Sequence, residues 1–108
     1  MGDEAAVTKP ISPYDIPEKP IPGGVFEAFN ELIIREFDGN RAVVWQKEAA
    51  KLASEKTGFS IDALYSKKFM DVELSYTKAG WEVVYDKPGY NESYPPSYTF
   101  RKPKAGRA

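Results

Sequence analysis

The chain contains few residues that could carry out catalytic chemistry. Its 108 residues include no histidine and no cysteine, so the usual general base and the thiolate nucleophile are both missing. Catalysis would need carboxylates, lysines or tyrosines that converge in a cleft. Asp71 and Glu73 are two residues apart on a predicted helix, where side chains at that spacing diverge. The sequence has no glycine-rich phosphate loop, nucleophile elbow or metal-ligand motif. We therefore expect a protein that is not an enzyme, with no metal and no cofactor.

Lysines and tyrosines are the residues that could bind a partner, and they favour different kinds of partner. The net charge is −1, yet it is distributed unevenly. Residues 1–40 carry three basic and eight acidic residues (net −5), whereas residues 41–104 carry eleven basic and eight acidic residues (net +3). This mildly basic second part permits nucleic-acid binding but does not by itself indicate it. Tyrosine and proline are concentrated in residues 87–96, and such groups favour protein interfaces.

The composition predicts a cytoplasmic protein with one folded domain. Charged residues make up 29% of the chain, and no apolar run approaches the length of ~18 residues that indicates a membrane-spanning helix. The first residues also lack the basic-then-apolar pattern of a signal peptide. We therefore expect no membrane partner.

The two ends of the chain are predicted to lie outside the folded domain. Residues 1–24 form a proline-rich and flexible N-terminal arm, because prolines at this density remove backbone donors and favour extended chain. Ile11, Tyr14 and Ile16 lie between the prolines, so this arm could pack back along the domain or dock on a partner. Residues 103–108 are predicted to form a basic, frayed tail.

Residues 25–102 are predicted to form the folded domain. Apolar residues recur at three- and four-residue steps over Val25–Phe37, which predicts an amphipathic helix. Arg41–Trp45 is short and β-branched, and is predicted to be a strand. Gln46–Thr57 is predicted to be a helix with a face of small residues, which Gly58 ends.

Two further helical segments are predicted after that helix. Ser60 is a good N-cap for a helical turn over Ile61–Ser66, and a longer helix is predicted over Phe69–Ala79. The pattern allows either one bent helix or two over this part of the chain. On the longer helix, Val72 and Tyr76 share an apolar side with Phe69. The opposite side carries Lys67, Lys68, Asp71, Ser75 and Lys78.

A β-hairpin with a long loop is predicted at the end of the domain. Apolar and polar side chains alternate over Trp81–Asp86 and over Ser97–Lys102, as in half-buried strands. Lys87–Pro96 is far longer than a tight hairpin turn, so these residues are predicted to form an extended loop between the strands.

The order of helix, short strand, small-residue helix, helix and long-looped hairpin resembles the winged-helix family. The resemblance covers residues 25–102 and depends on element order, on Gly58 and Gly80, and on the loop, which would be the wing. It implies an α+β fold with three helices, in which Arg41–Trp45 joins the hairpin in a small antiparallel sheet. A looser similarity to small uncharacterised bacteriophage proteins implies an origin without an activity. The stretches that carry it are Asp71–Glu73, Gly80–Val83 and Tyr85–Glu92.

The winged-helix resemblance implies a small regulator that binds double-stranded DNA. In that arrangement the helix Phe69–Ala79 enters the major groove, with Asp71 and Ser75 facing base edges. Basic residues around this helix would contact phosphates. They are Lys47, Lys51, Lys67, Lys68, Lys78, Lys87, Arg101 and Lys102. However, Asp71 repels phosphate, and the proposed base-reading face has neither arginine nor asparagine, which are common base-reading residues.

A protein partner is the alternative, with the chain acting as an adaptor or as an inhibitor of a host protein. The wing and the start of the next strand are rich in groups that are common at protein interfaces. These are Tyr90, Tyr94, Pro95, Pro96 and Tyr98. The charges from Lys87 to Ser97 are limited to Lys87 and Glu92, so the wing lacks the basic tip of a minor-groove reader. A homodimer through the first helix or the N-terminal arm is also compatible with the pattern.

Overall fold

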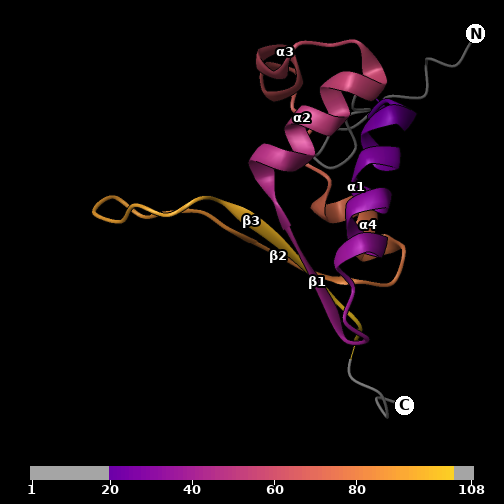
Figure 1. The fold of residues 1–108 in the computed structure, drawn as a ribbon, viewed down its shortest axis with the longest axis vertical. Helices are drawn as coiled ribbons and strands as arrows, with labels where there is room; N and C mark the ends of the chain where they lie inside the picture. Colours follow the sequence, from indigo (N-terminus) through magenta and orange to yellow (C-terminus); the bar gives the residue numbers. More distant parts are fainter. Residues whose placement is uncertain (1–19, 104–108) are drawn as a thin grey trace, which may run out of the picture.

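The computed structural model describes residues 20–103, which form an α+β fold with four helices and one three-stranded antiparallel sheet. The helices are α1 (Gly23–Glu36), α2 (Gln46–Thr57), α3 (Ile61–Ser66) and α4 (Glu73–Lys78), and the strands are β1 (Arg41–Trp45), β2 (Glu82–Asp86) and β3 (Ser97–Arg101). Helices α1 and α2 pack side by side, α3 lies at one end of the body and α4 lies beside the lower half of α1 (Figure 1). None of the helices in this described part is long and apolar enough to cross a membrane.

The predicted ends of the chain lie mostly outside the described residues. The flexible N-terminal arm was predicted for residues 1–24 and the frayed tail for residues 103–108, and of these only residues 20–24 and 103 are described. Helix α1 begins at Gly23, so the predicted start of the domain at Val25 is slightly late. Gly24 lies against the end of α2, where an added Cβ would come within 2.8 Å of the Thr57 side chain.

The sheet confirms the prediction that Arg41–Trp45 joins the hairpin. Its strand order is β1-β3-β2, and both pairings are antiparallel. Phe100 in the central strand pairs with Ala42 on one side and Val83 on the other. These residues point toward the helices, and Phe100 and Ala42 are fully buried. Thr99 pairs with Val43 and Val84, which therefore lie on the opposite, outer face of the sheet.

The core lies between the inner face of the sheet and helices α1, α2 and α4. Phe29 of α1 packs edge-on against Tyr98, with ring centroids 5.0 Å apart, and against Phe100 at 6.1 Å. The small-residue face predicted for α2 is confirmed, because Ala49 and Ala53 are fully buried where α2 meets α1. Small side chains at these positions allow the two helices to approach closely.

The prediction of one helix over Phe69–Ala79 is wrong in its first half. Of the two alternatives left open for residues 61–79, the structure has two separate helices, so residues 20–103 contain four helices in place of the three that the winged-helix resemblance implies. Lys68 has φ of 62°, a left-handed conformation that ends a right-handed helix. The following residues are buried, with Phe69 6% and Met70 2% exposed. The carbonyl of Met70, released from helical bonding, accepts a hydrogen bond of 2.9 Å from the Tyr98 hydroxyl. The apolar run therefore reflects burial of an irregular segment before α4 begins at Glu73.

Candidate interaction surface

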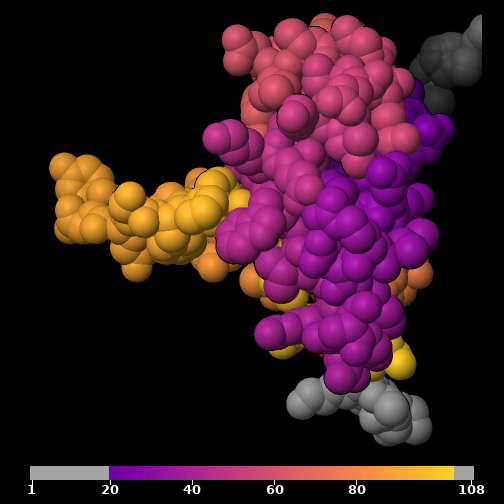
Figure 2. Space-filling model, in the orientation of Figure 1, coloured from indigo at the N-terminus to yellow at the C-terminus, as the bar shows by residue number. Residues whose placement is uncertain are grey.

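The loop between β2 and β3 forms a projection that stands clear of the body, and we call residues 87–96 the finger (Figure 2). The sheet pairing ends where Asp86 pairs with Ser97. Beyond that pair, the Tyr94 hydroxyl shares its proton between two acceptors, the Asp86 carboxylate at 2.9 Å and the Lys87 carbonyl oxygen at 2.7 Å. This bond to Asp86 raises the pKa of Tyr94 to about 12. Tyr94 thus fastens the two sides of the finger together near its base.

The tip of the finger is a turn closed by two hydrogen bonds. The backbone N–H of Glu92 donates to the Gly89 carbonyl oxygen at 3.2 Å. In return, the backbone N–H of Gly89 donates to the Glu92 carboxylate at 2.8 Å. Tyr90 lies between these residues, and its side chain is 100% exposed. The turn therefore presents an aromatic side chain to solvent on a backbone that is already closed.

The outer face of the sheet continues the exposed apolar area from the base of the finger. Trp45 and Val84 are each 47% exposed, although both are large apolar residues. Trp45 pairs with Ser97, which in turn pairs with Asp86, so the tryptophan lies in the row of the sheet nearest the finger. We define the finger surface as Trp45, Val84, Tyr90 and Tyr94.

The finger surface is electrically balanced. Arg101 and Glu82 form an ion pair of 3.5 Å on the outer face of the sheet. Together with the finger, this face carries three basic and three acidic residues. They are Arg41, Lys87 and Arg101, and Glu82, Asp86 and Glu92. An exposed aromatic area without excess charge fits a protein surface better than a polyanion.

Two of the residues named for the protein-partner alternative take other roles. Tyr98 is 2% exposed, and its ring lies in the core. Burial raises the pKa of the Tyr98 hydroxyl. The expectation that Tyr98 contributes to an exposed interface is therefore wrong. Pro96 is half-buried, and its carbonyl oxygen accepts a hydrogen bond of 3.0 Å from the backbone N–H of Gln46, which joins the end of the finger to α2. Pro95 remains exposed beside Tyr94.

The two lysines predicted on α2 lie in different surroundings. Lys47 is exposed at the first turn of the helix. Lys51 lines a shallow groove between α1 and α2 that also contains Glu48 and Glu55. Arg35 from α1 reaches into this groove and contacts Glu48 at 2.9 Å. The acidic side chains make the surroundings of Lys51 mixed in charge rather than positive.

The residues predicted to share one face of a DNA-reading helix are divided among several segments. Lys67 and Lys68 lie in the turn that follows α3, and Asp71 lies in the irregular link. Ser75 and Lys78 belong to α4, which is six residues long and so spans about 9 Å. Since α3 and α4 lie at different heights of the body, these side chains form no single helical face (Figure 1).

The remaining predicted DNA contacts lie along the hairpin. Lys87 is exposed at the start of the finger, and its carbonyl oxygen accepts from Tyr94. Arg101 is engaged in its ion pair with Glu82. Lys102 is exposed, and its backbone N–H donates to the Asn40 carbonyl oxygen at 2.9 Å.

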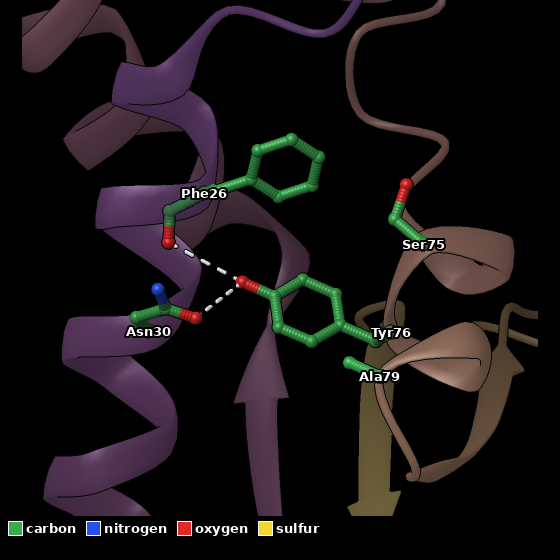
Figure 3. A pocket seen from close by; sticks show the side chains of 5 residues that line it. All are labelled: Phe26, Asn30, Ser75, Tyr76 and Ala79. Atoms are coloured by element: carbon green, nitrogen blue, oxygen red, sulfur yellow. Dashed lines mark hydrogen bonds between the residues drawn. The ribbon is translucent and has the colours of Figure 1, made fainter.

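A pocket between α1 and α4 was not predicted from the sequence (Figure 3). Its volume is about 300 Å³. The Tyr76 hydroxyl enters from α4 and donates to the Asn30 side-chain oxygen at 2.6 Å, with the Phe26 carbonyl oxygen at 3.3 Å. Phe26 and Asn30 are four residues apart on α1, so they share a helical face. This spacing is the sequence signal that places the two residues side by side. Ser75 and Ala79 complete the lining.

Comparisons with other proteins leave the chain without an assigned family. No protein-family model matches it, and no curated protein or solved structure is significantly similar to it. Within residues 20–103, no group of three or more histidine, cysteine, aspartate or glutamate side chains is arranged to hold a metal ion. Function is therefore inferred from the finger surface and the pocket.

Proposed function

We propose that this chain is a protein-binding module that docks on a partner protein through the finger surface. The observation that carries this proposal is Tyr90, which is 100% exposed on a tip that two hydrogen bonds already close. An aromatic residue on an ordered turn loses little conformational freedom on binding, so more of its contact energy contributes to affinity. Tyr90 therefore serves as the anchor that enters a pocket on the partner.

The rest of the finger surface supplies area and orientation. Trp45 and Val84 give a second apolar contact on the outer face of the sheet, the face that also carries Asp86, to which the Tyr94 hydroxyl is bonded. Equal numbers of basic and acidic residues surround them, so binding does not depend on a polyanionic partner. The partner that fits has an apolar cleft for the tip and a mixed polar rim.

The fold is proposed to be a winged-helix variant in which the finger is the wing. The element order α1, β1, α2, α3, α4, β2 and β3 and the strand order β1-β3-β2 support this assignment. The irregular link at residues 67–72 interrupts the continuous helix with which a winged helix reads a DNA groove. Such a variant is suited to act as an adaptor or as an inhibitor of another protein.

The test compares recovery of partner proteins by the immobilised full chain and by two variants. Tyr90→Ala removes the anchor and is expected to lower recovery by about tenfold or more, the effect of losing an interface hot spot. Leu74→Ala is the matched control, because Leu74 is a large apolar residue that is 64% exposed on α4, away from the finger. Equal recovery of every bound protein by the wild type and by Tyr90→Ala would remove the basis of the proposal.

Duplex DNA is the second candidate partner. The observation that favours it is a set of lysines that form no ion pair with another residue in 20–103. They are Lys47, Lys51, Lys67, Lys68, Lys78, Lys87 and Lys102. If they contact phosphates, the double variant Lys68→Ala with Lys78→Ala lowers the slope of log affinity against log salt concentration by the amount expected for about two phosphate contacts. Fluorescence anisotropy that stays flat with duplex DNA at low salt would exclude this candidate.

A further inference from the structure

The pocket between α1 and α4 has the chemistry of a peptide site. Its aromatic walls are Phe26 and Tyr76, whose ring centroids are 5.9 Å apart with the planes at 66° (Figure 3). Its volume of about 300 Å³ lies at the lower end of the usual range for ligand pockets, about 300–1,000 Å³. This space accepts a few side-chain groups rather than a large cofactor.

The pocket has donors that make no hydrogen bond to the described residues and face solvent, because Asn30 is exposed and Ser75 is half-buried. The Asn30 side-chain oxygen is used by the Tyr76 hydroxyl at 2.6 Å. The Asn30 amide NH₂ and the Ser75 hydroxyl donate no hydrogen bond to any residue in 20–103. A ligand that combines apolar groups with free carbonyl oxygens can pack on the aromatic walls and accept from these donors.

An extended proline-rich segment has both properties. It has no internal backbone hydrogen bonds, so its carbonyl oxygens remain free, and grooves lined with aromatic residues bind such segments. The chain contains a proline-rich sequence before α1, in residues 10–19. Ile11, Tyr14 and Ile16 add apolar side chains between its prolines.

We propose that the pocket between α1 and α4 binds the N-terminal arm of the same chain through Tyr14 and Ile16. The described chain starts at Pro20, and Ile21 packs against the core next to the start of α1. Extended chain advances about 3.1 Å per residue, so Ile16 lies within about 12 Å of Pro20 and Tyr14 within about 19 Å.

These lengths are sufficient to reach the pocket. Phe26 lies in the first turn of α1, and Asn30 lies about 11 Å along the helix from Gly23 at 1.5 Å per residue. The arm therefore reaches the pocket after one reversal of direction. A tether this short also gives the segment an effective concentration in the millimolar range, which favours it over a separate molecule. This inference does not depend on the proposed function of the finger.

Paramagnetic relaxation enhancement on the full chain tests this proposal. Because the chain has no cysteine, Ser12→Cys creates a unique attachment site for a nitroxide spin label on the arm. We expect loss of the NMR signals of the Asn30 side-chain amide and of the Ser75 and Ala79 backbone amides. The signals of Val43, on the outer face of the sheet, should remain.

Two controls make the outcome specific. With the label in place, the additional changes Tyr14→Ser and Ile16→Ser should restore the pocket signals, because they remove the apolar groups without touching the described fold. Mixing labelled chain with isotope-enriched, cysteine-free chain should leave the pocket signals intact. Signal loss in that mixture would assign the pocket to a second copy and overturn the proposal. Pocket signals that survive in the labelled chain, or losses that persist in the double serine variant, would also overturn it.

Discussion

Replacing Tyr98 by phenylalanine should destabilise the protein by removing one buried hydrogen bond. The Tyr98 hydroxyl donates to the Met70 carbonyl oxygen at 2.9 Å, and the residue is only 2% exposed. Phenylalanine keeps the ring, so the edge-on contact with Phe29 remains available. The substitution removes the hydrogen bond that links β3 to the irregular segment before α4, together with the long contact of 3.5 Å that the Gln46 side-chain amide donates to the same hydroxyl.

The expected magnitude follows from the burial of both partners. Met70 is 2% exposed, so its carbonyl oxygen gains little access to water when the hydroxyl is removed. The oxygen keeps one donor, the backbone N–H of Val72 at 3.0 Å, so the substitution removes one hydrogen bond without leaving the acceptor unpaired. The net loss of one such bond is about 0.5–1.5 kcal/mol. We therefore expect Tyr98→Phe to lower the free energy of unfolding by about 1 kcal/mol.

Tyr85→Phe is the matched control for this substitution. The Tyr85 hydroxyl donates to the Gln46 side-chain oxygen at 3.1 Å, and Tyr85 is only half-buried. Water can replace that donor, so the loss should be about 0.5 kcal/mol. Urea unfolding followed by tryptophan fluorescence and circular dichroism measures both values. Equal losses for the two variants, or no loss for Tyr98→Phe, would refute the account of the segment before α4.

Three further predictions concern a turn, a buried phenol and the finger. The Asp38 carboxylate accepts from the backbone N–H groups of Arg41 and Asn40, each at 2.9 Å, and these bonds lower its pKa. The Asp38 carboxylate therefore stabilises the fold above its unfolded pKa of about 3.9, and this stabilisation is lost as pH falls through the folded pKa. Asp38→Ala should flatten the acid decline of the free energy of unfolding, measured by unfolding curves at several acidic pH values. Burial raises the pKa of Tyr76 to about 12, so the free energy of unfolding should fall as pH rises from about 10 toward that value. Tyr76→Phe should reduce this alkaline decline, measured by urea titrations. Tyr94→Phe should increase fast backbone motion in the finger, measured by NMR order parameters, while the thermal midpoint of the body stays unchanged.

Local signals in the sequence were sufficient to predict most elements. Arg41–Trp45, Gln46–Thr57 and Ile61–Ser66 were predicted with the bounds found in the structure. The β-branched run in the first, the terminating Gly58 at φ of 84° and the Ser60 cap that accepts from Ala63 are all properties of adjacent residues.

The segment before α4 could not be predicted in the same way. Phe69, Val72 and Tyr76 recur at helical spacing, so periodicity favoured one continuous helix. The structure buries the same residues on a path that leaves the helix, because the Met70 carbonyl finds a donor in Tyr98. That partner lies far along the chain, and a local pattern contains no information about it.

The interaction surface was predicted in composition but not in geometry. The sequence indicated a loop rich in tyrosine and proline, yet it did not distinguish exposed Tyr90 from buried Tyr98. Strand alternation places Tyr98 and Phe100 on one face, but the identity of the buried face depends on where the helices pack. The closed tip likewise depends on the Glu92 carboxylate returning to the Gly89 N–H.

Site-specific photocrosslinking is the most direct test of the finger as a protein-docking element. A benzophenone amino acid is placed at position 90 in one variant and at position 74 in another, and each full chain is irradiated in an extract of the cells that produce it. Tyr90 is 100% exposed and Leu74 is 64% exposed, so both probes face solvent at two different places on the chain. The account predicts a discrete adduct of one partner protein at position 90 and none at position 74. No adduct at position 90, or the same adducts at both positions, would contradict it.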